Sequence, residues 1–154
     1  MGTKRIGLAR IEALIENLSR DLAVGSSTII SGAKGIQFVA TARTATAAGL
    51  TTGTIADGTS FVAVTSGGAN NIIILPTPTP GTVVWLSENA GTTGFELRTS
   101  APATVGINAG TASNGESAIA GAITLVRCVC VSATNWVCTQ FDADGDESKV
   151  EAAA

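Results

Sequence analysis

Three cysteines near the end of the sequence are the residues best suited to metal or redox chemistry. Cys128 and Cys130 are two positions apart, so on a β-strand they project from the same face, and Cys138 follows after a turn at 132–135. Three thiolates are one ligand short of a structural zinc site, and C-x-C is not its usual spacing. An odd number of cysteines without a secretion signal also disagrees with a disulfide framework. The sequence therefore predicts buried free thiols that behave as small apolar side chains, and no metal.

A second candidate for metal chemistry is the acidic run at 142–147. Asp142, Asp144 and Asp146 stand at positions 1, 3 and 5 of a calcium-loop pattern. The glycine falls at the fourth position instead of the sixth, and Ala153 stands where such a loop needs a glutamate. We therefore expect residues 142–154 to form an acidic flexible tail that is solvated and carries no ion.

Enzymatic chemistry has little support in the sequence. The chain contains no histidine, which removes the Ser/His/Asp and Cys/His arrangements of nucleophilic catalysis. A glycine pair at 67–68 lacks the Gly-Lys-Ser/Thr ending of a phosphate-binding loop. Glu88 and Glu96 are carboxylates eight positions apart on flanking strands, and nothing in their spacing marks them as a glycosidase pair. We expect no catalytic residue, no cofactor and no enzyme, with a small β-fold hydrolase as a remote alternative.

Length and composition narrow the class of protein further. The chain has 154 residues, enough for one domain with an appendage. Hydrophobic residues make up 45% of it but aromatic residues 4%, so the core of a monomer would be thin, and burial between identical subunits would supplement it. The net charge of −3 offers no basic field for nucleic acid. No apolar run reaches the length of a membrane span, so neither a membrane nor nucleic acid is an expected partner.

The elements that would position these residues are short strands in the stretch 72–141. β-Branched and aromatic residues favour a pleated sheet, while glycine, proline and asparagine favour the turns between strands. The apolar runs lie at 82–86, 95–98, 104–108, 123–131 and 135–141. This spacing predicts a mainly β protein, with a β-sandwich or jelly-roll-like domain at 67–141. Residues 25–66 are then an arm or connecting segment with short strands at 37–43 and 60–65.

The last predicted hairpin alternates between two faces and contains one charged residue. Arg127 shares a face with apolar neighbours, and an arginine in such surroundings needs an acidic or carbonyl partner. Glu96 and Glu88 are the candidate partners for a structural ion pair. The face of Arg127 contains Leu125, Val129 and Val131, and the opposite face contains Val126, Cys128 and Cys130.

One amphipathic α-helix is predicted at the N-terminus, within residues 1–24. Its apolar side chains fall within roughly 120° of one another at about 100° per residue. Two alternatives remain open for this stripe: packing on the chain's own β domain, or association with symmetry mates or a partner. The terminal position and the Gly/Ser-rich stretch at 25–27 favour the second. The stripe consists of Leu8, Ile11, Leu14, Ile15, Leu18 and Leu22.

A succession of short motifs resembles a β module recurrent in tailed-phage virion proteins. The motifs are a strand with a Leu75-Pro76 ending, a proline-rich crossing into a second strand at 81–84, and a closing hairpin that ends in Trp136. An I-N-G-like turn is present as Ile107-Asn108-Ala109-Gly110, a departure of one residue. The opening at 4–14 is similar to the N-terminal helix of marine-phage structural proteins, including capsid decoration (cement) proteins.

The resemblance implies a homotrimer that binds the major capsid protein on the outside of the head and clamps neighbouring capsomers. Such a protein is made in the host cytoplasm and resides in the virion. The helical stripe would then be an oligomer or capsid interface. In the same setting, the alternative is a head fibre or a tail-associated receptor-binding protein, which needs aromatic or polar clefts that this sequence has few residues to build.

Overall fold

The computed structural model describes residues 28–31, 35–47, 52–88, 93–108, 115–121 and 123–152, and these residues are mainly β, as the sequence predicts. The described part contains thirteen strands and no helix. It therefore contains no helix long and apolar enough to cross a membrane. The predicted N-terminal helix and its stripe (Leu8, Ile11, Leu14, Ile15, Leu18 and Leu22) lie outside the described residues.

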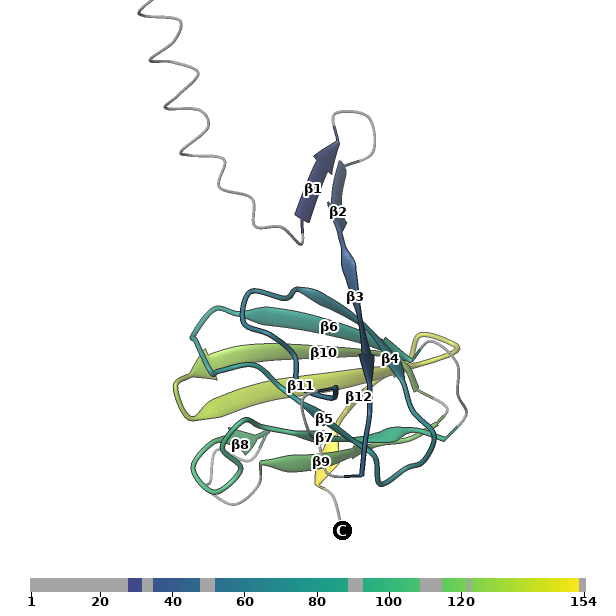
Figure 1. The fold of residues 1–154 in the computed structure, drawn as a ribbon, viewed down its shortest axis with the longest axis vertical. Helices are drawn as coiled ribbons and strands as arrows, with labels where there is room; N and C mark the ends of the chain where they lie inside the picture. Colours follow the sequence, from purple (N-terminus) through teal and green to yellow (C-terminus); the bar gives the residue numbers. More distant parts are fainter. Residues whose placement is uncertain are drawn as a thin grey trace, which may run out of the picture.

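Two sheets form the body of the protein, and a hairpin stands apart from them (Figure 1). The large sheet has the order β12-β11-β10-β6-β4-β3, with β8 beside β11, and the small sheet has the order β13-β9-β7-β5. The arm is the hairpin of β1 (Thr28–Ser31) and β2 (Gly35–Phe38). The large sheet comprises β3 (Ala40–Thr44), β4 (Phe61–Thr65), β6 (Val83–Glu88), β8 (Gly106–Ile107), β10 (Ile123–Ser132), β11 (Asn135–Asp142) and β12 (Glu147–Lys149). The small sheet comprises β5 (Ile72–Ile74), β7 (Phe95–Arg98), β9 (Glu116–Ile119) and β13 (Glu151–Ala152).

From β3 to β7 the chain winds between the two sheets. After each strand of the large sheet it crosses to the small sheet and then returns one position further along, so that neighbouring strands are parallel. Ala40 is paired with Phe61, and Phe61 is paired with Trp85. The two residues of each pair are separated by one turn of the winding along the chain. Parallel neighbours need a crossover connection, which is commonly a helix. In this protein the crossover from β4 to β6 is the strand β5 of the opposite sheet, and the connection from β3 to β4 touches β5 through isolated bridges at Thr46 and Thr54.

Alternation along the strands places one set of apolar side chains between the two sheets. Trp136, the largest buried side chain, is fully inaccessible to solvent. Burial of each large apolar side chain contributes about 1.5–3 kcal/mol. The core also contains Val62, Val64, Val84, Leu86, Val126 and Cys128 from the large sheet and Ile73, Phe95, Leu97 and Ile119 from the small sheet.

The chain itself closes both edges of the sandwich. At one edge it passes from β3 through buried Ala45 to Thr46, which bridges Ile72 of β5. At the other edge β12 continues through buried Val150 into β13, which pairs with β9. Exposed sheet edges invite pairing with other chains, so crossings of this kind protect the fold from edge-to-edge association.

The predicted domain boundaries need correction. β3 and β4 lie within the predicted connecting segment 25–66, yet both are strands of the large sheet. Residues 142–154 were expected to be a flexible tail, but β12 and β13 add a strand to each sheet. The β module therefore extends from 40 to 152 instead of 67 to 141. The side chains of β12 are polar and exposed, so its sequence looks like that of a solvated tail. Its pairing with β11 is an interaction between distant segments that local sequence does not reveal.

Asn108 forms a side-chain clamp between β8, β11 and the β12–β13 crossing. Its backbone is left-handed, with φ of 58°, a conformation that asparagine tolerates better than most residues. Its Oδ1 accepts a hydrogen bond from the backbone N–H of Cys138 at 2.7 Å. Its Nδ2 donates to the carbonyl oxygens of Cys138 at 2.9 Å and Val150 at 3.0 Å. The asparagine of the I-N-G-like sequence thus joins three segments of the fold.

Candidate functional site

The side of the large sheet that faces away from the small sheet carries rows of apolar side chains. Register places Val83 opposite Val129, and Val129 opposite Val137, across β6, β10 and β11. The next row places Trp85 opposite Arg127. Opposite side chains of neighbouring strands lie close enough to pack against one another. We call this surface the outer face; its large apolar members are Phe61, Val83, Trp85, Leu125, Val129, Val131, Val137 and Phe141.

Several of these side chains are open to solvent. Val83 is 38% exposed, Val137 40% and Val131 52%. An antiparallel sheet with one solvated face normally alternates apolar and polar residues, so that the outward side chains are polar. A contiguous apolar surface on a folded domain commonly marks a site of contact with protein or another apolar partner. The outer face is therefore the candidate contact surface of this protein.

Arg127 lies in the middle of the outer face and is held by aromatic rings and one carboxylate. Its guanidinium carbon is 5.9 Å from the ring centroids of both Trp85 and Phe141. Its Nη2 donates to Oε1 of Glu147 at 3.0 Å. The predicted faces of β10 are confirmed, but Glu88 and Glu96 as partners of Arg127 are wrong. Glu147 belongs to β12, which the sequence places in a tail instead of beside β11.

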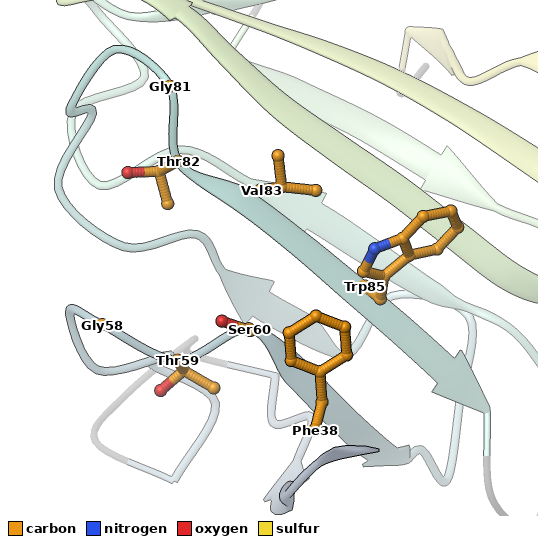
Figure 2. Close-up of a pocket in the computed structure, with 8 residues that line it drawn as sticks. All are labelled: Phe38, Gly58, Thr59, Ser60, Gly81, Thr82, Val83 and Trp85. Atoms are coloured by element: carbon orange, nitrogen blue, oxygen red, sulfur yellow. The ribbon is translucent and has the colours of Figure 1, made fainter. Parts of the chain in front are cut away.

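A groove lies where the outer face approaches the base of the arm (Figure 2). Its volume is about 490 Å³. The Phe38 ring and the Trp85 indole line it from different strands, and hydroxyl groups of Thr59, Ser60 and Thr82 lie along its margin. None of its lining residues carries a charge. Because Val83 and Trp85 belong to both surfaces, the groove and the outer face are continuous.

The two carboxylates considered for glycosidase chemistry lie on different sheets. Glu88 is the last residue of β6 in the large sheet. Burial raises its pKa, and a hydrogen bond from the backbone of Gly94 lowers it by a smaller amount. Glu96 lies on β7 of the small sheet, 3.4 Å from Arg98, which is itself 2.8 Å from Glu116. Burial and the neighbouring Glu116 raise the pKa of Glu96, while Arg98 opposes the rise. The structure thus brings Glu96 together with Glu116, not with Glu88.

The three cysteines are buried free thiols, as predicted. Cys128 and Cys138 are directly opposite each other in the β10–β11 hairpin and point into the core. Burial raises the pKa of the Cys128 thiol well above its ordinary value, and the neighbouring Cys138 raises it further. Burial also raises the pKa of Cys130, whose Sγ lies 3.1 Å from the carbonyl oxygen of Ser132.

We expect these thiols to react much more slowly with thiol reagents in the folded protein at neutral pH than in urea. The thiolate is the reactive form, and the raised pKa of Cys128 and Cys130 keeps its population low at these two residues. Burial also restricts the access of a reagent to all three thiols. Kinetics with a chromogenic disulfide reagent would measure the difference, and elemental analysis should find no stoichiometric zinc. Rapid reaction of all three thiols in the native state, or one metal per chain, would contradict the assignment.

The acidic run at 142–147 forms the turn between β11 and β12. Oδ1 of Asp142 accepts hydrogen bonds from the backbone N–H groups of Asp144 at 3.0 Å and Asp146 at 2.9 Å. Gly145 supplies the left-handed backbone that the turn requires, with φ of 87°. In the part of the chain that the structure describes, no group of three or more Cys, Asp or Glu side chains is arranged to hold a metal ion. The first aspartate of the calcium-like pattern therefore has a local structural role.

Comparison with known protein families, with curated proteins and with solved structures finds no match to this chain. Sequence reasoning did not identify the outer face, because β10 is apolar on both faces and so resembles a strand covered on both sides. The sequence feature that could have indicated this face is the alternate set of valines at 129, 131 and 137. The sequence does not show whether another element covers these valines, so their exposure could not be predicted.

Proposed function

We propose that this protein is a non-enzymatic capsid decoration (cement) protein of a tailed phage. It sits as a homotrimer on the outside of the head and contacts the major capsid protein. Two lines of support lead to this proposal: the motif resemblance of the β module and the architecture of the arm. The arm is the observation on which the proposal rests.

The arm stands away from the sandwich and is joined to it through β3 (Figure 1). β1 and β2 pair with each other and form a separate two-stranded sheet. An isolated two-stranded hairpin is at best marginally stable in water, so it gains order from a surface outside its own domain. At its base Phe38 is 43% exposed and Val39 38% exposed. These properties suit a segment that reaches onto a neighbouring subunit.

The mechanism would be mechanical. An arm and a rigid sandwich on each of three subunits provide several weak contacts per trimer, and the capsid lattice repeats each contact. Once one contact forms, the others act at a high effective concentration, so that weak individual affinities combine. A decoration protein of this kind stabilises the head by adding buried surface across the junctions between capsomers.

The location on the particle tests the proposal. Gold-labelled antibodies raised against the protein, or a cryo-EM map of the native particle, should place it at regular positions on the head. Labelling at the tail tip would favour the alternative of a tail-associated receptor-binding protein. Absence from purified particles would reject both virion functions.

The oligomeric state is a separate prediction. Light scattering on the purified protein should give about three times the monomer mass of 15.3 kDa. The physical reason is the thin core and the arm, which both gain from burial against a second copy. A monomer across the micromolar range would contradict the trimer.

A further inference from the structure

The outer face of the large sheet is largely apolar around the ion pair of Arg127 and Glu147, and no described element packs over it. The small sheet covers the opposite side of the large sheet, where the core lies. The exposed valines of β6, β10 and β11 are therefore the one part of this sheet's apolar surface that lacks a second layer within the described ranges. The small sheet is the second layer of the sandwich, so an element that covers the outer face would be a third layer.

The N-terminal segment enters the described structure beside this surface. Thr28, the first described residue, is the register partner of Phe38, and Phe38 lines the groove with Trp85. Residues 24–27 separate the predicted helix from Thr28. The five Cα–Cα steps from residue 23 to Thr28 span at most about 18 Å, so a helix that ends at residue 23 would end within that distance of Thr28.

The predicted helix has the dimensions and chemistry to cover the outer face. A helix over residues 4–23 would be about 30 Å long. The valine row that would receive it spans three adjacent strands, β6, β10 and β11, a width of about 10–14 Å at about 4.8 Å spacing. About two turns of the helix would therefore lie over this row. The stripe is aliphatic, and the row on the sheet that would receive it is made of valines. A helix that starts at the groove and runs across the strands would therefore bury both apolar surfaces at once.

We infer that residues 4–23 form a helix that packs on the outer face of the chain's own large sheet, with its C-terminal end at the groove. The stripe of Leu8, Ile11, Leu14, Ile15, Leu18 and Leu22 then packs on the outer face, and about two turns of it contact the row of Val83, Val129 and Val137. Of the two alternatives for the stripe, this is packing on the chain's own domain. The inference does not depend on the proposed function, because it concerns the free protein.

The short linker selects the chain's own helix over that of a second copy. A linker of a few residues holds the two segments that it joins at a millimolar effective concentration. Docking within one chain therefore outcompetes docking between chains at the micromolar concentrations of purified protein. Docking within the chain is also independent of dilution, which distinguishes it in experiment.

Fluorescence of Trp85 reports whether the outer face is covered. The other tryptophan, Trp136, is fully buried, so a change in quenching by a neutral aqueous quencher arises from Trp85. In the full-length chain, Ile15→Asp should increase the quenching of Trp85 and shift its emission to longer wavelength, while β-sheet circular dichroism is retained. Ala13→Asp introduces the same charge on the opposite side of the predicted helix and should change neither signal.

A second variant tests the same contact from the sheet. Val137 is already 40% exposed, so Val137→Asp leaves the core intact and should also increase the quenching of Trp85. The double variant with Ile15→Asp should add little to either single change, because both remove one contact. Wild-type quenching in both single variants would overturn the inference. If dilution both increases the quenching of Trp85 and lowers the molecular mass of the protein in solution, the cover comes from a second copy of the chain, and the inference is overturned.

Discussion

Replacing Asn108 with alanine is expected to lower the free energy of unfolding by about 3–5 kcal/mol. The substitution removes three hydrogen bonds to the backbone of Cys138 and Val150, while the Cys138 carbonyl oxygen still accepts a hydrogen bond from the Val150 N–H at 3.4 Å. The Cys138 N–H and the Val150 carbonyl lose this partner, and because they are only part-buried each costs about 1–1.5 kcal/mol, the lower end of the usual range. It also places alanine in a left-handed conformation, which costs about 1–2 kcal/mol. Urea denaturation followed by circular dichroism measures the change.

Two other variants separate these contributions. Asn108→Gly relieves the backbone cost but not the loss of hydrogen bonds, so it should recover about 1 kcal/mol relative to alanine. Asn135→Ala makes the same chemical change where Oδ1 has no hydrogen-bond partner among the described residues, and should have a much smaller effect. Equal stability of the Asn108→Ala and Asn135→Ala variants would show that Asn108 is not a clamp.

Replacing Gly94 with alanine is the other substitution with a large expected effect, about 3–5 kcal/mol. The φ angle of Gly94 is 70°, which is unfavourable for alanine. An added Cβ would also meet backbone atoms of Ile119, Ala120 and Gly121, where β9 turns toward β10. A backbone neighbour cannot move aside as the end of a side chain can, so the strain adds to the conformational cost.

Gly145 provides the matched control for this prediction. Its φ of 87° is similarly left-handed, but an added Cβ would meet nothing within 4 Å. Gly145→Ala should therefore cost only the conformational contribution, about 1–2 kcal/mol. Thermal or urea unfolding of both variants makes the comparison. If the two substitutions were equally costly, close packing at Gly94 would not be the cause.

The parts of the fold that could be predicted are those that local pattern determines. Alternation along residues 123–131 correctly separates Arg127 and Val129 from Cys128 and Cys130, because a strand has a period of two. The burial of the thiols follows from the same alternation. The partner of Arg127 could not be found in this way, since Glu147 reaches it only after β12 pairs with β11.

The winding of β3 to β7 was beyond prediction for a related reason. The sequence shows where strands begin and end, but a turn between strands does not reveal whether the next strand joins the same sheet or the opposite one. Ile72–Ile74 and Val83–Glu88 are consecutive strands and could have formed a hairpin. They lie in different sheets, and each pairs in parallel with a strand one turn away.

The closure of both sheet edges has a consequence for how this chain folds. Winding from β3 to β7 can proceed in the order of synthesis, because each strand pairs with one made a turn earlier. The sandwich is complete only after residues 147–152 have been made, because β13 pairs with β9 and Val150 packs in the core, and β12 and β13 follow every other described strand in the chain. Folds dominated by such distant pairings form slowly. Until those residues leave the ribosome, β9 and β11 remain open edges at which nascent chains can associate with one another.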